Sequence, residues 1–503
     1  MDLASLRKGL EQHRQSHLLQ FWDDLSSENQ KELYDDLSSI DLDRVCQYFG
    51  KATTGLSEAQ TKSDERLEPV PEKVCGSTSR MSSDEHKQLF DSGLRLIAEG
   101  KVAALLLAGG QGTRLGVPYP KGMYNVQLPS GKTLYQLQAE RLLKLQELAF
   151  KLTNRHGVIP WYIMTSEHTK DKTVKFFQEH SYFGLEADNV IVFEQHMLPC
   201  FTFEGQIILA GKHKVARAPD GNGGLYSALG SADVIADMRR RGVECMHAYC
   251  VDNILVKMAD PVFVGFCHQR SADCGAKVVE KAFPTEAVGV VCQVDGHYEV
   301  VEYSEIALKT AELRREDGRL TFNAGNICNH YFTTDFIESI VTEHDSSLQH
   351  HVAKKKIPFV SDDGSITTPT TPNGIKMEKF VFDVFQFSKQ FAVLEVLRED
   401  EFAPLKNGPG AAKDTPATCR SSLLNQHYRW VLAAGGKFMD SEGSVLPLIP
   451  ARSSSMPHTT DIDCEVSPMA SYAGEGLEEL CANQVLTAPI QVVPGKIIKP
   501  ECS

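Results

Sequence analysis

The sequence lacks the features that mark a membrane-spanning, secreted or nucleic-acid-binding protein. No apolar run approaches the roughly 20 residues that a transmembrane helix needs. The N-terminal stretch MDLASLRKGLEQHRQ has no continuous apolar core of the kind found in a secretory signal. An excess of basic residues is also missing, because the formal net charge is -14 at pH 7, and this argues against general nucleic-acid binding. We therefore expect a cytoplasmic protein that binds neither nucleic acid nor membranes.

Cysteines with the spacing of a metal or redox site are absent as well. The 13 cysteines are scattered from Cys46 to Cys502, and no two of them form a CxxC pair. An odd number without regular spacing favours free thiols in a reducing compartment over a disulfide framework or a zinc site.

The chain is longer, at 503 residues, than a single hydrophobic core usually supports, so we expect more than one domain. Apolar residues near a 3.6-residue spacing predict two or three amphipathic helices in the first fifty residues. The polar segment 53–85 indicates a linker or an extended wrap, and KNGPGAAKDTP at 406–416 indicates a boundary. These patterns predict a helical segment with a linker over 1–100, a main domain over 101–405 and a C-terminal domain over 406–503.

Short apolar runs alternate with helical stretches from Val102 onward. VIPWYIM, VIVF and MHAYCV are examples of these runs, and the alternation predicts a mainly parallel sheet flanked by helices. Thr133 is placed to cap the helix that carries Leu134, Leu137 and Leu145 on its buried stripe. Asp295-Gly296 predicts the turn of a hairpin.

A glycine-rich turn, Gly109-Gly110-Gln111-Gly112, follows seven apolar residues directly. It is not a dinucleotide fingerprint, because Leu115 stands where GxGxxG needs its third glycine, and the later GKT is not a Walker A motif, because Val126 replaces the leading glycine. A tight structural turn is one interpretation. The other is a phosphate site, because glycine amides approach a phosphate closely and Arg114 and Lys121 follow in the same loop.

Asp252 ends the apolar run CMHAYCVD, and we expect it to project from the carboxyl edge of a buried strand, where ligands bind in such folds. An unpaired carboxylate there is costly unless a cation compensates it, and Mg²⁺ prefers one or two carboxylates together with phosphate oxygens. A helix N-cap is the alternative role. Asn253 is a weaker candidate for a second ligand.

The turn and the segments after it resemble the sugar-nucleotide pyrophosphorylases. LAGGQGTRLG with PKGM behind it resembles their signature. EQHMLPC, APDGNGGLY, YCVDNIL, VVEYSEI, FNAGNICNH, NGIKMEKFVFD and LREDEFAPLKN follow in the order and spacing of the eukaryotic UDP-N-acetylglucosamine (UDP-N-acetylhexosamine) pyrophosphorylases and their close "-like" paralogues. The likeness extends from HLLQFW to SYAGEGLE, nearly the whole chain. It implies an α/β, Rossmann-like nucleotidyltransferase fold of the GT-A-like type, with an N-terminal helical and a small C-terminal β-containing domain.

The resemblance implies a uridylyltransferase that makes UDP-N-acetylglucosamine and pyrophosphate from UTP and N-acetylglucosamine 1-phosphate, with UDP-N-acetylgalactosamine as a second product to consider. Mg²⁺, or Mn²⁺ in its place, is the implied cofactor, and the domain over 101–405 is the implied catalytic domain. UTP and an N-acetylhexosamine 1-phosphate are the expected partners, and we expect a monomer or a homodimer.

The resemblance also implies roles for individual residues. The implied nucleotide-binding residues are Leu107, Ala108, Gly109, Gly110, Lys121, Gln195, Gly221 and Lys376. The implied sugar-phosphate-binding residues are Asn222, Glu302, Tyr303, Asn326 and Lys406. The implied catalytic residues are Arg114, Lys121 and Lys376, and Asp252 is the implied metal ligand. Taken alone, the lysines are compatible with surface charges, and PDGNGG is compatible with a flexible turn.

The mechanism expected for these residues is electrostatic. The attacking group is already a phosphate oxyanion, so no general base is needed, and cations are needed to bring it up to a triphosphate. Two alternatives remain at this level: another sugar, galactosamine or glucose, or a catalytically weak paralogue that binds a UDP-sugar in a regulatory or scaffold role. Arg217 stands where the family pattern has an uncharged residue, and it would add positive charge if it turned toward the nucleotide.

Overall fold

The computed structural model describes residues 2–54, 64–440, 442–446 and 462–499. The chain divides into two compact units, each built from three stretches of sequence. Unit 1 comprises 1–66, 195–231 and 340–384, and unit 2 comprises 67–194, 232–339 and 385–503. The domain boundaries expected from the sequence, 1–100, 101–405 and 406–503, remain a prediction.

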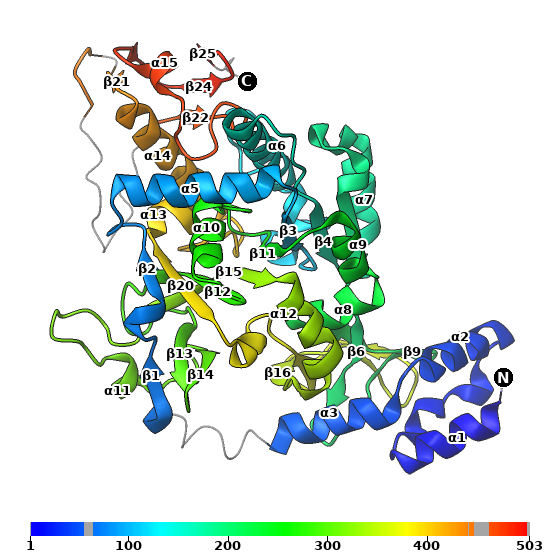
Figure 1. The fold of residues 1–503 in the computed structure, drawn as a ribbon. Helices are drawn as coiled ribbons and strands as arrows, with labels where there is room; N and C mark the ends of the chain where they lie inside the picture. Colours follow the sequence, from blue (N-terminus) through cyan, green and yellow to red (C-terminus); the bar gives the residue numbers. More distant parts are fainter. Residues whose placement is uncertain (1, 55–63, 441, 447–461, 500–503) are drawn as a thin grey trace. The chain divides into compact units, whose positions relative to one another are not determined.

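Unit 2 is built on an 11-stranded sheet, most of whose strands are labelled in Figure 1. Its main path, in spatial order, is β2 (Cys75–Ser77), β20 (Phe391–Val396), β12 (Cys274–Glu280), β15 (Ala324–Thr333), β11 (Cys245–Cys250), β3 (Val102–Leu107), β4 (Trp161–Thr165) and β5 (Val190–Glu194). Every neighbouring pair on this path is parallel except the two that β15 makes with β12 and β11. The expected mainly parallel α/β sheet is confirmed, and β15 makes its main path mixed.

The apolar runs form the interior of this sheet. All six residues of β3 are buried, as are all five of β4, because helices cover both faces of an interior parallel strand. The helices of unit 2 are α5 (Ser83–Ala98), α6 (Leu134–Thr153), α7 (Lys170–Glu179), α9 (Val234–Arg241), α10 (Pro261–Gln269), α11 (Leu308–Ala311), α12 (Thr334–Ser339), α13 (Arg398–Glu401), α14 (Pro416–Ala433) and α15 (Glu478–Cys481). The predicted cap of α6 is confirmed, because the Thr133 side chain accepts a hydrogen bond from the Gln136 amide.

Helices α5 and α10 lie side by side in Figure 1, and glycine permits their close approach. A Cβ on Gly93 of α5 would lie 2.1 Å from the Pro261 carbonyl oxygen, and one on Gly265 of α10 would lie 2.2 Å from the Leu89 carbonyl oxygen. Only residues without a side chain fit at this crossing.

The polar segment 53–85 contains strands that its composition did not predict. β1 (Leu67–Pro69) pairs with β13 (Val290–Val294), and β2 adds a parallel edge strand beside β20. β13 also forms the predicted hairpin with β14 (His297–Val301), which turns at Asp295 and Gly296, both at positive φ. The described part of this segment therefore extends the sheet instead of acting only as a linker.

The chain after 406 belongs to unit 2, and its described residues form α14, α15 and five short strands. These strands are β21 (Lys437–Phe438), β22 (Cys464–Val466), β23 (Val485–Leu486), β24 (Ile490–Val493) and β25 (Lys496–Ile498). The expected small β-containing C-terminal region is thus present.

Unit 1 contains the predicted N-terminal helices, α1 (Leu3–Gln12), α2 (Ser27–Ser38) and α3 (Leu42–Thr54), together with α8 (Leu225–Ser231). Its short strands are β6 (Met197–Pro199), β7 (Phe201–Thr202), β8 (Leu209–Gly211), β9 (Lys214–Val215), β10 (Arg217–Pro219), β16 (His351–Lys355), β17 (Phe359–Val360), β18 (Ile366–Thr367) and β19 (Gly374–Glu378). The apolar faces of α1, α2 and α3 share one buried cluster with Phe201, Leu209 and Ile375.

Arg217 takes part in this packing and does not add charge to a nucleotide site. Its Nε and Nη2 donate to Asp36 Oδ1 at 3.0 and 2.7 Å, and Nη2 also donates to the Ser39 hydroxyl at 2.9 Å. The other oxygen of Asp36 accepts the Val215 amide. The guanidinium therefore binds α2 to β10 within unit 1.

Candidate functional site

The glycine turn and Asp252 leave the sheet at the same edge. β3 and β11 are parallel neighbours in a register that sets Leu107 opposite Cys250. The turn follows Leu107 directly, and Asp252 follows Cys250 by two residues. Because the carboxyl ends of parallel strands meet at one edge, the loop of each strand begins beside the loop of the other. This edge of unit 2 is the candidate site.

Burial and hydrogen bonds to the neighbouring strand β4 and to Ser166 after it fix the start of the turn. Leu107 and Ala108 are buried, and the Ala108 amide donates to the Met164 carbonyl at 2.8 Å. The Ser166 hydroxyl donates to the Gly109 carbonyl at 2.9 Å. Gly110 is exposed, and a Cβ built on it would meet nothing within 4 Å. Packing inside the described chain therefore does not require glycine at 110, and its backbone is open to a ligand.

Packing requires glycine at two other positions of the loop, 112 and 122. A Cβ on Gly112 would lie 2.4 Å from Val117 Cγ2, and one on Gly122 would lie 2.2 Å from the Tyr135 ring of α6. The tight turn and the open backbone are therefore both present, at different glycines of the same loop.

The two predicted charged groups of this edge meet. Lys121 Nζ lies 3.8 Å from Asp252 Oδ2, and both side chains keep about a fifth of their surface exposed, at 17% and 21%. Arg114 lies in the same loop, in the short helical turn 113–115, and is exposed. Among the described residues no hydrogen bond or ion pair of the Arg114 side chain is found. The loop thus presents two cations, of which Lys121 lies beside the Asp252 carboxylate.

The N-cap interpretation of Asp252 is wrong. No helix of the described chain begins at residue 253; the next one is α10, which starts at Pro261. Its capping residue is Asp260, whose Oδ1 accepts the Val262 amide at 3.1 Å. The Asp252 carboxylate therefore caps no described helix and faces Lys121 instead.

Asn253 does not supply the second metal ligand considered from the sequence. Its Nδ2 donates to the Glu401 carbonyl at 2.7 Å, and its Oδ1 accepts the Ala403 and Leu255 amides. The described residues contain no group of three or more His, Cys, Asp or Glu side chains that would enclose a metal ion. A single carboxylate fits Mg²⁺, which is commonly held by one or two carboxylates together with substrate phosphates and water.

The segment that carries Lys406 runs beside Asp252. The Leu405 amide donates to the Asp252 carbonyl at 2.8 Å, and the Lys406 amide donates to the Asp414 carbonyl at 2.9 Å. The structure therefore brings the backbone of Lys406 next to the loop that carries Asp252.

Two of the residues expected to bind the sugar lie against Gly289. The Asn326 amide donates to the Gly289 carbonyl at 2.8 Å, and a Cβ on Gly289 would lie 2.9 Å from Glu302 Oε1. Glu302 follows β14 and Asn326 lies in β15, so the hairpin brings them together. Tyr303 is 50% exposed, and its ring is not packed into the core.

The remaining expected residues belong to unit 1. Gln195 is buried at 6% exposure, and Lys376 lies on β19 and is half-buried. Gly221 has a φ of +84°, and a Cβ there would lie 2.3 Å from the Lys379 carbonyl oxygen, so the PDGNGG loop needs its glycine for structure. Asn222 Oδ1 accepts the Val381 amide at 3.0 Å, which fixes the side chain.

Sequence reasoning missed the buried charges under the PDGNGG loop. Lys379 is 2% exposed and pairs with Asp345 at 2.9 Å, while its backbone amide donates to the Asp220 carbonyl at 2.7 Å. Burial raises the pKa of Asp220 to about 7. Only the motif EKF, which follows Lys376 closely, marks this lysine in the sequence, and it does not distinguish a buried lysine from a surface one.

Comparisons with known proteins find a matching family model and similar proteins. Residues 45–451 match the family model described as UTP--glucose-1-phosphate uridylyltransferase. The chain is 54% identical to UDP-N-acetylhexosamine pyrophosphorylase-like protein 1 of Xenopus tropicalis over 94% of this chain and 93% of that protein. It is 40% identical to UDP-N-acetylglucosamine diphosphorylase 2 of Arabidopsis thaliana over 97% of this chain and 93% of that protein.

A solved structure shares the fold over most of the chain. The crystal structure of the uridine diphosphate N-acetylglucosamine pyrophosphorylase from Trypanosoma brucei in complex with an inhibitor superposes with a TM-score of 0.79 and 29% identity, over 95% of this chain and 94% of that chain. In the described part of this chain, no helix has the length and apolar character that crossing a membrane would require.

Proposed function

This chain belongs to the UTP--glucose-1-phosphate uridylyltransferase family, and from that premise we propose that it transfers a uridylyl group from UTP to an N-acetylhexosamine 1-phosphate. UDP-N-acetylglucosamine and pyrophosphate are the products. The observation that carries the proposal is the position of Lys121 and Asp252, 3.8 Å apart at the sheet edge where the glycine turn leaves its backbone open.

The reaction is an exchange at the α-phosphorus of UTP. An oxygen of the sugar phosphate forms a bond to the α-phosphorus, and the bond from that phosphorus to the oxygen bridging to the β-phosphate breaks, so that pyrophosphate leaves. The attacking oxygen is already an anion, so no proton has to be removed. What the chain must supply is alignment and positive charge.

We assign these tasks to the residues of the edge. The backbone of Gly109 and the open backbone of Gly110 approach the nucleotide phosphates, with Arg114 as a fork of donors and Lys121 as a point charge. Asp252 would hold Mg²⁺ or Mn²⁺, and the ion would supply charge neutralisation at the phosphates. Lys406 binds the sugar phosphate, with Glu302, Tyr303 and Asn326 at the sugar.

The roles of the unit 1 residues rest on the family resemblance. Lys376 is assigned to phosphate, Gln195 and Gly221 to the nucleotide, and Asn222 to the sugar. The fixed Asn222 side chain and the glycine at positive φ support a preformed loop on unit 1.

We also propose a cytoplasmic location and a monomeric or homodimeric protein. The twelve cysteines that the structure describes are all free, which fits a reducing compartment.

Pyrophosphate release from the purified chain tests the function. UTP is supplied with N-acetylglucosamine 1-phosphate, N-acetylgalactosamine 1-phosphate or glucose 1-phosphate, with and without Mg²⁺, and ATP replaces UTP as the control. We expect metal-dependent release with UTP and an N-acetylhexosamine 1-phosphate. Pyrophosphate release with glucose 1-phosphate alone would show that the substrate is glucose 1-phosphate and not an N-acetylhexosamine 1-phosphate. Binding of UDP-N-acetylglucosamine without any turnover would favour a regulatory or scaffold role.

A further inference from the structure

A polar link lies beneath the candidate site and joins its two segments. One segment is 252–260, which begins with Asp252, and the other is 398–406, which ends with Lys406. The two run antiparallel where Asn253 is bridged to Pro404. The Asp252 carbonyl accepts the Leu405 amide, and the Ile254 amide donates to the Ala403 carbonyl at 3.2 Å.

The Asn253 side chain adds two bonds to this short ladder. Asn253 and Pro404 face each other between the two backbone bonds, so the missing amide hydrogen of Pro404 leaves neither bond unmade. The Asn253 side chain donates to the Glu401 carbonyl at 2.7 Å and accepts the Ala403 amide at 3.0 Å. It is 2% exposed, so solvent does not replace these bonds. The same Oδ1 accepts the Leu255 amide at 3.3 Å, which closes a turn within its own segment.

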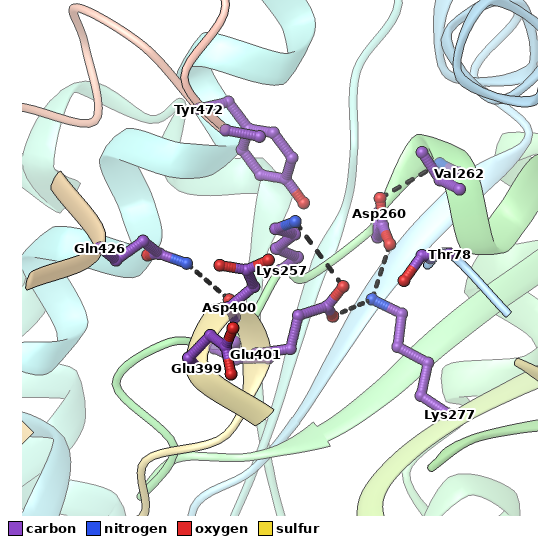
Figure 2. Close-up of polar contacts among 12 residues, drawn as sticks. Thr78, Lys257, Asp260, Val262, Lys277, Glu399, Asp400, Glu401, Gln426 and Tyr472 are labelled. Atoms are coloured by element: carbon purple, nitrogen blue, oxygen red, sulfur yellow. Dashed lines mark hydrogen bonds and ion pairs between the residues drawn. The ribbon is translucent and has the colours of Figure 1, made fainter. Parts of the chain in front are cut away.

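A buried ion cluster fixes the far ends of both segments (Figure 2). Lys277 of β12 has no exposed surface, and its ammonium pairs with Asp260 at 2.6 Å and with Glu401. Asp260 ends the first segment and Glu401 lies in the second. Lys257 approaches Glu401 from the other side at 3.7 Å, so two cations balance two carboxylates. The central sheet therefore holds both segments through one lysine.

We propose that Asn253 is a positioning residue for uridylyl transfer, which sets Asp252 and Lys406 relative to each other by tying segment 252–260 to segment 398–406. The inference rests on the proposed function, because it takes Asp252 as the metal ligand and Lys406 as the sugar-phosphate ligand. The bonds of the Asn253 side chain go to backbone groups of Leu255, Glu401 and Ala403, so we assign it a role that acts through these segments.

Two substitutions separate the link from the local turn. Asn253→Ser keeps a hydroxyl that can accept the Leu255 amide, as serine does in such turns, but it is too short to reach Glu401 and Ala403. Asn253→Ala removes both. Thr334→Val is the matched control, since Thr334 is fully buried and its hydroxyl donates to the Val243 carbonyl at 2.8 Å near the opposite, amino-terminal edge of β11.

The measurements are the Mg²⁺ concentration for half-maximal rate, the KM for the sugar phosphate, and Mn²⁺ binding in the presence of UTP followed by electron paramagnetic resonance. All are normalised to the folded fraction from thermal unfolding. We expect Asn253→Ser and Asn253→Ala to raise the metal requirement, the Mn²⁺ Kd and the sugar-phosphate KM about tenfold. Thr334→Val is expected to lower stability and leave all three unchanged.

The outcomes are distinguishable. Unchanged metal and sugar-phosphate constants per folded Asn253→Ser molecule would overturn the positioning role while leaving the function intact. A defect in Asn253→Ala with a normal Asn253→Ser would assign the effect to the turn at Leu255 and also overturn the link. A wild-type chain without pyrophosphate release would instead refute the proposed function.

Discussion

Gly110 and Gly122 lie in the same loop but have different surroundings. A substitution at Gly110 should therefore affect ligand binding, whereas one at Gly122 should affect folding stability. Gly110 has open space where a side chain would be, whereas a Cβ on Gly122 would lie 2.2 Å from the Tyr135 ring. Both are glycines of one loop in the sequence, and only the surrounding atoms distinguish them.

Gly110→Ala and Gly122→Ala should therefore fail in different ways. In Gly110→Ala the methyl group stands between the backbone and the phosphates, so we expect a UTP KM raised about tenfold with an unchanged melting temperature. In Gly122→Ala the methyl group meets the Tyr135 ring, and overpacking should lower the free energy of unfolding by about 1–3 kcal/mol. Thermal unfolding and initial rates measure both. Equal melting-temperature losses in the two variants would contradict the distinction.

Arg114 is the exposed cation of the loop, and its role is electrostatic. Arg114→Ala should lower kcat/KM by about a hundredfold or more, because a preorganised donor to developing phosphate charge is lost. The fold should remain intact because the side chain is exposed. Arg155→Ala, an exposed arginine just after α6, is the control. A near-normal rate for Arg114→Ala at equal protein concentration would remove Arg114 from the site.

At the scale of elements, two charged side chains, those of Lys277 and Arg217, join different helices and strands. Lys277 links β12 to α13 and to the N-terminus of α10, and Arg217 links β10 to α2. Burial raises the pKa of the Glu401 carboxyl, and the neighbouring ammonium groups of Lys277 and Lys257 oppose that rise. Removing one partner of such a buried ion pair destabilises the fold strongly, because the other charge is left buried without compensation.

Lys277→Met should leave the carboxylates of Asp260 and Glu401 with Lys257 as the one remaining lysine of the cluster. We expect a loss of about 3–5 kcal/mol in the free energy of unfolding, measured in urea, because an uncompensated buried charge remains. Adding Glu401→Gln to Lys277→Met should recover part of that loss by removing one of the unpaired charges. No recovery in the double variant would show that the lysine acts through packing and not through charge.

Arg217→Ala should loosen the docking of α2 within unit 1. The two bonds to Asp36 are partly buried and charge-assisted, and we expect a loss of about 1.5–3 kcal/mol in the free energy of unfolding. A double-mutant cycle with Asp36→Ala isolates the pair. The UTP KM of Arg217→Ala should not change. A raised KM with full stability would restore the nucleotide-site interpretation of Arg217.

At the scale of the whole molecule, buried histidines make stability depend on pH. Burial lowers the pKa of His247, His350 and His427 to about 3 each. A histidine in the unfolded chain has a pKa of about 6.5. Below that pH the unfolded chain therefore binds protons that the folded chain does not. The stability from these groups is complete above pH 6.5 and falls as the pH decreases toward 3.

Each of these histidines should therefore cost about 2 kcal/mol of stability between pH 7 and pH 5. His427 accepts the Val466 amide through Nδ1, so His427→Gln keeps an acceptor without a titrating group. Urea unfolding at pH 7 and pH 5 should show a smaller loss on acidification in this variant than in the wild type. An identical loss would mean that other groups govern the acid sensitivity.

The sequence by itself determined the sheet strands with long apolar runs, the helix capped by Thr133, the hairpin at Asp295-Gly296 and the edge that carries Asp252. These follow from local patterns, because apolar runs, caps and turn residues act over a few neighbours. The motif order also gave the family. The site roles of individual residues remain proposals on that basis.

Only the tertiary structure decided which partners distant residues find. It showed that Asp260 and not Asp252 caps α10, that Asn253 bonds to 401–403, that Arg217 holds α2, and that the polar segment after 64 adds β1 and β2 to the sheet. The physical reason is that a lysine, an arginine or an asparagine has the same local preferences whether it is solvated or buried against a segment more than a hundred residues away. Burial and pairing at such separations are properties of the folded chain.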